Sequence, residues 1–267
     1  MSRQERLHEL VVVWFWRIVI LAGALCAWQF LPQIESLRGR AKWLNPFFIS
    51  SPERVYHEIV RLVTGSHGTP PVWPELWTTV QATLVGSASG LLIGVFLGAV
   101  LSNDERLARI FSGYIAMLNA MPRVALIPII VIVVGAGVRA SMVASAIIVT
   151  FLTFFNAFEG GRSVPAPILQ NARVLGATKW QVMVRVRLPN VMIWTFAAVP
   201  NAVAFGLVSV VTTELLTGTI GMGGLMLAAT SNLNADLSFS VMIILSVVGI
   251  TLVSIAERIK QRVLHWR

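Results

Sequence analysis

The chain alternates between long runs of apolar residues and shorter polar stretches. Most of the runs approach or exceed the roughly 20 residues that an α-helix needs to cross a bilayer. Six such runs are present, at residues 10–31, 77–101, 110–134, 141–158, 190–212 and 239–256. We therefore predict an all-α polytopic membrane protein with six transmembrane helices.

The composition agrees with this pattern and excludes a soluble globular domain. Hydrophobic residues make up 56% of the chain, charged residues make up 12%, and the mean hydropathy is +0.76. The net charge of +9 is also typical of nucleic-acid-binding proteins. Here, however, the basic residues flank apolar runs, where they meet anionic lipid headgroups, so we expect no nucleic-acid partner.

Residues that could carry chemistry are few and scattered. Cys26 is the only cysteine in the sequence, which excludes an intramolecular disulfide and a multi-cysteine metal site. The four histidines lie apart in ends and loops, and no glycine-rich loop ends in Gly-Lys-Ser or Gly-Lys-Thr. The sequence therefore predicts no catalytic site, no metal and no cofactor.

Glycine and proline mark two of the runs. Within the second run, glycine recurs at every fourth position, at Gly86, Gly90, Gly94 and Gly98. That spacing places the glycines on one stripe of a helix, where another backbone can approach closely, so we interpret it as helix packing. Pro122 and Pro128 interrupt the third run, and we expect a kinked helix with freed carbonyl groups inside the bundle.

The polar connection at residues 32–76 contains the signature of one short helix. Ser51, Pro52 and Glu53 form a helix start, with a capping residue, a first-turn proline and an early acid. Apolar residues then recur on one face, and Gly65 can end the helix. We predict an amphipathic helix that lies on the outer membrane interface.

A polar stretch at residues 159–189 separates the fourth and fifth runs. Its pattern predicts two short helices, of which the first has an apolar face made by Ile168, Leu169, Ala172 and Leu175. Gly176 can end this helix, because glycine adopts a left-handed conformation without steric cost. Thr178 and Gln181 form a possible capping box for the second helix, and Pro189 is expected to close it.

The distribution of charge predicts which side each loop faces. Six spans place both termini on one side of the membrane, together with the polar stretch 159–189. The short loops and tails on that side are strongly basic, so we assign them to the cytoplasm. Their cations are Arg3, Arg6, Arg106, Arg109, Arg162, Arg173, Lys179, Arg185, Arg187, Arg258, Lys260, Arg262 and Arg267.

The polar stretch resembles the Glu-Ala-Ala motif of ATP-binding-cassette (ABC) importer permeases. In that motif, Glu-Ala-Ala is followed after three residues by Gly, and after nine more by an aliphatic residue, one residue and Leu-Pro. The matching positions here are Gln170-Asn171-Ala172, Gly176, Val186 and Leu188-Pro189, with Gln and Asn in place of Glu and Ala. The segments from Met121 to Gly137 and from Glu214 to Gly224 are also similar to this family.

The resemblance implies the type I ABC importer permease fold and a function in transport. It implies a coupling helix that docks into a groove on a separate cytoplasmic ATPase, present in two copies, and therefore no enzymatic activity in this chain. It also implies a second permease subunit, either another copy of this chain in a homodimer or a close relative, a periplasmic or lipid-anchored solute-binding protein, and a bacterial inner-membrane location. The residues assigned to ATPase coupling are Gln170, Asn171, Ala172, Gly176, Ala177, Leu188 and Pro189.

With this assignment the chain divides into four parts. These are a cytoplasmic tail with the first helix (1–31), an extracytoplasmic loop (32–76), a five-helix permease core (77–257) containing the coupling loop 159–189, and a basic tail (258–267).

Several polar residues fall in or near the apolar runs, where lipid contact is costly, so we expect them to face the interior of the bundle. They are Asn119, Arg123, Asn156, Asn201, Thr212 and Glu214. Four of them are candidates for the solute pathway: Asn119, Arg123, Asn201 and Glu214. The two asparagines could equally bond to neighbouring helices. Arg123 either reaches the cytoplasmic interface from a kinked helix start or lines the pathway as a cation for an anionic solute.

Two kinds of transporter fit these observations. The first is the permease of an ABC importer for a small anionic or zwitterionic solute such as nitrate, a sulfonate or taurine, or for a heterocycle related to thiamine precursors. The alternative is an ion-coupled secondary transporter, which usually needs acidic residues deep in the membrane, whereas the acids here lie at the ends of the apolar runs. No inverted repeat is apparent either.

Overall fold

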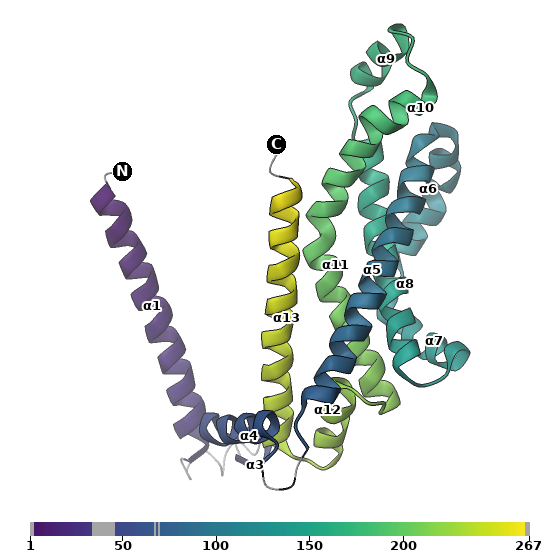
Figure 1. Cartoon of the computed structure of the whole chain (residues 1–267). Helices are drawn as coiled ribbons and strands as arrows, with labels where there is room; N and C mark the ends of the chain where they lie inside the picture. Colours follow the sequence, from purple (N-terminus) through teal and green to yellow (C-terminus); the bar gives the residue numbers. More distant parts are fainter. Residues whose placement is uncertain (1–2, 34–45, 67, 69, 265–267) are drawn as a thin grey trace. The chain divides into compact units, whose positions relative to one another are not determined.

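The computed structural model describes residues 3–33, 46–66, 68 and 70–264, and in this part of the chain every regular element is helical (Figure 1). The chain divides into two compact units. The first holds the described residues up to Val72 together with Ala228–Ile244, and the second holds Trp73–Leu227 and the described residues from Leu245 onward.

The first unit contains the long helix α1 (Arg3–Phe30), the short elements η1 (Leu31–Gln33) and α3 (Pro46–Ile49), and α4 (Pro52–Thr64). It also holds the first part of α13 (Ala235–Val263). Trp28 at the end of α1 donates a hydrogen bond to the carbonyl of Ile49 (3.1 Å), and its ring lies 5.3 Å from that of Phe239. The Ser50 hydroxyl donates to the Asp236 carboxylate at 2.5 Å. These contacts join the end of the first predicted span to the start of the last.

Helix α4 confirms the helix predicted in the first long loop. The Ser51 hydroxyl accepts the N–H of Arg54, Pro52 occupies the first turn, and Gly65 ends the helix in the left-handed conformation with φ of 66°. Val55 and Leu62 are buried, as expected for an amphipathic helix. Its place on the outer interface stays a prediction.

The second unit is built around three long helices, α5 (Trp73–Asn103), α8 (Val138–Arg162) and α11 (Leu188–Thr217). The glycine stripe of α5 packs directly against α8. A Cβ atom at Gly98 would lie 2.6 Å from Cβ of Ala157, and one at Gly94 would overlap the Thr153 hydroxyl. Thr153 also donates to the carbonyl of Gly90 at 3.2 Å. The predicted role of the stripe in close helix packing is confirmed.

The third predicted span is not one kinked helix. It is broken into α6 (Glu105–Ala120) and α7 (Ile127–Val134), with the short turn η3 (Arg123–Leu126) between them and a bend of 86°. Met121 and Pro122 are both extended at the break, and Met121 is so because the residue before a proline is disfavoured in the helical region. Pro128, expected to add a kink, instead lies in the first turn of α7, where proline is tolerated.

The predicted count of spans depends on this break. Among the described residues, five helices are long and apolar enough to cross a membrane, and the broken pair makes a sixth if it is counted as one span. The observed helices also extend beyond the predicted runs. For example, α13 begins at Ala235 and α11 continues to Thr217, past Glu214.

The polar stretch forms α9 (Ala166–Val174) and α10 (Lys179–Val182), which we call the polar hairpin (residues 166–182). Figure 1 shows the hairpin beyond the ends of α5, α8 and α11. The expectation that Pro189 closes the second helix is wrong. From α10 the chain runs through a π-helical turn, η4 (Met183–Arg187), directly into α11.

The π-helical turn explains why Pro189 does not stop the helix. The N–H of Leu188 donates to the carbonyl of Met183, five residues earlier, so the hydrogen-bond register shifts just before the proline. Pro189 directly follows this shift in register, which accommodates its missing N–H within the helix. Residues Lys179–Thr217 therefore form one continuous helical element.

Candidate coupling and pathway sites

The turn of the polar hairpin is determined by local sequence. Gly176 has φ of 78°, and the N–H of Ala177 donates to the carbonyl of Ala172 at 3.0 Å, which is the hydrogen bond of a Schellman motif. The Thr178 hydroxyl accepts the N–H of Gln181 at 3.2 Å, and the Gln181 side chain accepts the N–H of Thr178 at 2.8 Å. The predicted helix end and capping box are both present.

The tip of the hairpin exposes large apolar side chains. Val174 and Leu175 are each 86% exposed, and Trp180 is 73% exposed. Of the predicted apolar face of the first helix, Ile168 and Leu175 are exposed in the described part of this chain, whereas Leu169 is half-buried. Gln170 and Asn171 are also exposed, whereas Ala172 and Ala177 are half-buried. An uncovered apolar tip on a polar hairpin is typical of a protein-binding surface.

The base of the hairpin is tied to the ends of two long helices. Arg187 is 5% exposed and donates to the carbonyl of Ser102 in the last turn of α5. Asn190 donates to the carbonyl of Gly160 (2.5 Å) and to the hydroxyl of Ser163 (2.8 Å) at the end of α8. Sequence reasoning missed this anchoring role of Arg187 and Asn190, because their partners lie far away in the sequence.

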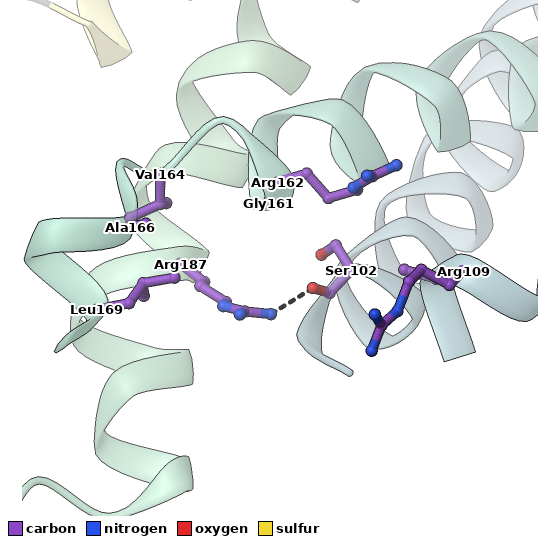
Figure 2. A pocket seen from close by; sticks show the side chains of 9 residues that line it. Ser102, Arg109, Gly161, Arg162, Val164, Ala166, Leu169 and Arg187 are labelled. Atoms are coloured by element: carbon purple, nitrogen blue, oxygen red, sulfur yellow. Dashed lines mark hydrogen bonds between the residues drawn. The ribbon is translucent and has the colours of Figure 1, made fainter. Parts of the chain in front are cut away.

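A cavity of about 350 Å³ lies beside this anchor. It is lined by Ala108 and by the residues labelled in Figure 2, where Arg187 reaches toward Ser102 while Arg109 and Arg162 stand nearby. We call the cavity the arginine pocket, after Arg109, Arg162 and Arg187. The Arg162 guanidinium also lies 5.4 Å from the ring centroid of Phe158.

Asp104 lies at the start of α6, close to this region. Its carboxylate accepts the N–H groups of Arg106 (2.7 Å) and Leu107 (3.3 Å), and so caps the helix. These two hydrogen bonds lower the pKa of Asp104, and the charges of Lys179 and Arg106 lower it further.

The break between α6 and α7 brings two of the pathway candidates together. The Arg123 side chain donates to Asn119 Oδ1 at 2.8 Å, and its guanidinium carbon lies 5.6 Å from the ring centroid of Phe155 on α8. Arg123 is half-buried and Asn119 is exposed. Asn201, next to Pro200 in α11, is exposed as well. That the two asparagines face the interior of the bundle stays a prediction.

Glu214 is placed differently from the other candidates. It lies inside α11, is 1% exposed, and accepts hydrogen bonds from the Thr79 hydroxyl and from the N–H of Gly223 at 2.9 Å. The N–H of Met222 donates to the Thr79 hydroxyl at 2.9 Å. The side chains of Thr79 and Glu214 thus accept hydrogen bonds from the first two N–H groups of α12 (Met222–Ser231). In this conformation Glu214 is covered, and its place in a pathway stays a prediction.

Gly221 and Gly223 pack so closely against Glu214 that neither position has room for a side chain. A Cβ atom at Gly221 would overlap the Glu214 carboxylate, and one at Gly223 would lie 2.7 Å from Glu214 Cβ.

Among the residues that the structure describes, no group of three or more His, Cys, Asp or Glu is placed to hold a metal ion.

Comparison with known proteins decides the family. The family model described as "Binding-protein-dependent transport system inner membrane component" matches residues 90–265. The chain belongs to this family. It is thus a permease of the ABC importer class, a transport protein rather than an enzyme, and a multi-pass protein of the inner membrane. The alternative of an ion-coupled secondary transporter is set aside by this membership.

Curated relatives of the family are similar over most of the chain. The riboflavin transport system permease protein RibX of Chloroflexus aurantiacus is 26% identical over 195 residues, covering 73% of each chain. The taurine transport system permease protein TauC of Escherichia coli is 22% identical over 277 residues, covering 98% of this chain and 96% of TauC. The putative aliphatic sulfonates transport permease protein SsuC of Bacillus subtilis is 25% identical over 198 residues, covering 72% and 68%.

Solved structures confirm the type I importer permease fold. A chain of the MetNI methionine ABC transporter, from a study of its inward-facing conformations, matches with a TM-score of 0.58 and 21% identity, covering 72% of this chain and 97% of that chain. A chain from an amino acid ABC transporter matches with a TM-score of 0.60 and 18% identity, covering 75% and 98%.

Proposed function

We propose that the polar hairpin is the surface through which a separate ABC ATPase drives this permease. The observation that carries the proposal is the exposed apolar tip of the hairpin, formed by Val174, Leu175 and Trp180. Such side chains are stabilised when a partner removes them from water. The replacement of the family's Glu-Ala by Gln170-Asn171 removes one charge from this surface and leaves the apolar contacts in place.

The connection between hairpin and bundle supports a lever mechanism. The hairpin continues without interruption into α11, while Arg187 and Asn190 tie the base of α11 to the ends of α5 and α8. A displacement of the tip would therefore move these helix ends together, as a rigid body, rather than bend a loop. ATP-driven closure of two ATPases would in this way change access to the pathway between two permease subunits.

The proposed assembly follows from one coupling hairpin per chain. We propose a dimer of permease subunits, most simply a homodimer, two cytoplasmic ATPases and a solute-binding protein on the opposite side. The basic short loops support a cytoplasmic position for the hairpin and for both termini. Of the seven residues assigned to coupling, Gln170, Asn171, Ala172 and Ala177 lie on the hairpin itself, and Gly176 shapes its turn. Leu188 and Pro189 lie at the start of α11, where they belong to the connection between the hairpin and the bundle.

For the solute, we propose a small anionic or zwitterionic molecule. Arg123 places a cation at a break between two membrane helices, and broken helices are where many transporters bind their substrates. The similarity to permeases named for taurine and aliphatic sulfonates supports the same class. Asn119 orients the guanidinium from α6, and Phe155 supports it from α8.

A second candidate solute is a neutral heterocycle, because a relative of comparable similarity is named for riboflavin transport. In that case Arg123 would serve only to stabilise the helix break through Asn119 and Phe155. Uptake by the complete transporter, with and without Arg123, separates the two candidates. Copurification of an ATPase with the intact chain, and its loss when the hairpin tip is changed, tests the coupling proposal.

A further inference from the structure

The arginine pocket concentrates positive charge at the base of the hairpin. Arg109 comes from α6, Arg162 from the last turn of α8 and Arg187 from η4, so three separate elements contribute one cation each to one cavity (Figure 2). None of the lining residues that the structure describes is acidic. Cations gathered around a concave surface raise the positive potential inside it and attract anions.

An adjoining cavity extends this positive region. It has a volume of about 510 Å³, shares Arg109 and Arg187 with the arginine pocket, and adds Arg106 and Lys179. Among its described lining residues Asp104 is the only acid, and its carboxylate is occupied in capping α6. Among the lining residues that the structure describes, the four cations Arg106, Arg109, Lys179 and Arg187 therefore outnumber the one acid.

We propose that the arginine pocket binds the phosphate group of an anionic phospholipid. Guanidinium groups present planar pairs of donors that match phosphate oxygens, and arginine is well suited to such contacts. The rest of the wall is partly apolar, with Ala108, Val164 and Leu169, which suits the glycerol and first acyl carbons of a lipid better than a free ion. Basic pockets between membrane helices on the cytoplasmic side are suited to lipid headgroups, and this step rests on the proposed orientation of the hairpin.

A bound lipid phosphate would brace the moving part of the transporter. It would bridge α6, the end of α8 and η4, and so join the hairpin base to two other elements. Anionic lipid would then stiffen the lever, and coupling between ATP hydrolysis and transport would depend on lipid composition.

The test uses the permease purified in detergent without its ATPase. Native mass spectrometry follows lipid binding during titration with phosphatidylglycerol or phosphatidylcholine. The test variant combines Arg109→Gln with Arg162→Gln and keeps Arg187, whose contact with Ser102 holds the fold. The matched control combines Arg258→Gln with Arg262→Gln, two arginines at the end of α13 that line neither cavity. The wild type and the control should bind phosphatidylglycerol in preference to phosphatidylcholine, and the test variant should bind phosphatidylglycerol roughly 30-fold more weakly.

Three results would overturn the proposal. The first is equal phosphatidylglycerol affinity in the test variant and the wild type. The second is displacement of the lipid by inorganic phosphate at equal concentration, which would identify a site for free anions. The third is a pair of observations: the assembled wild-type transporter retains no phosphatidylglycerol, and the test variant no longer binds its ATPase. Together these would show that the arginine pocket binds a carboxylate of a partner protein instead of a lipid. Because lipid binding is measured on the isolated permease, failure of ATPase docking at the hairpin tip would leave that measurement unchanged.

Discussion

The hydroxyl of Thr79 donates to the carboxylate of Glu214, 135 residues away in the sequence, at 2.8 and 3.0 Å from its two oxygens. Both residues are buried, and the same hydroxyl accepts the N–H of Met222. One side chain thus joins α5, α11 and the start of α12. A buried carboxylate needs such donors, because its transfer from water is otherwise very costly.

This contact predicts that Thr79→Val destabilises the protein although it preserves the shape of the side chain. The change removes a donor to Glu214 and an acceptor for Met222, which should cost about 2 kcal/mol and lower the midpoint of thermal unfolding by roughly 5 °C. Thr78→Val is the matched control, because the Thr78 hydroxyl bonds only to Pro74 within its own helix in the described structure. Equal midpoints for the two variants in detergent would show that the contact contributes nothing.

The glycine stripe predicts opposite effects for two identical substitutions. Gly94→Ala places a methyl group against Thr153 and the carbonyl of Thr150, so α5 and α8 must separate, at a cost of about 1–3 kcal/mol. Gly113→Ala in α6 meets no atom within 4 Å in the described structure and should stabilise the helix by roughly 0.5–1 kcal/mol. Unfolding midpoints of the two variants compare them directly, and a Gly94→Ala protein at least as stable as the wild type would contradict the packing argument.

The elements that sequence predicts well are those specified by near neighbours. The limits of α4 follow from Ser51, Pro52 and Gly65, and the turn of the polar hairpin follows from Gly176 and Thr178, because helix caps involve residues only a few positions apart. The glycine stripe is predictable for a similar reason, since a period of four residues places all its members on one face of a helix.

The features that sequence does not predict depend on distant partners or on a choice between local alternatives. Prolines lie both in the third predicted span and at the start of α11. The third span is broken by a bend of 86°, whereas the helix from α10 continues through a π-helical turn into α11. The outcome depends on how the surrounding helices satisfy the freed backbone groups. In the same way, the burial of Glu214 depends on Thr79, and no pattern within α11 points to that residue.

We expect two kinds of substitution at the hairpin tip to weaken binding of the ATPase. Gly176→Val forces a β-branched residue into a left-handed conformation, which should displace Leu175 and Trp180. Gly176→Asn is the control and should be tolerated, because asparagine adopts this conformation more readily. Leu175→Asp, or a charge at Ala172, leaves the backbone unchanged but opposes burial of the tip. Copurification of the ATPase should fall at least tenfold for Gly176→Val and Leu175→Asp and remain normal for Gly176→Asn, at equal protein levels in the membrane. An intact complex with both damaging variants would show that the tip is not the contact.

Arg123 provides the sharpest test of the solute class. If its guanidinium attracts an anionic group at the break between α6 and α7, Arg123→Ala should reduce uptake of taurine or an alkanesulfonate at least tenfold. The reason is that hydrogen bonds to charged groups contribute about 1.5–3 kcal/mol each. The amount of permease in the membrane should not fall. Arg123→Lys keeps the charge but not the planar pair of donors, so it should retain part of the uptake. Arg139→Ala, at an exposed position in the first turn of α8, is the control for a lost positive charge. Normal sulfonate uptake by Arg123→Ala would exclude this role. Uptake of riboflavin that does not depend on Arg123 would instead favour the heterocycle, because a neutral ring system gains little from a cation in the pathway.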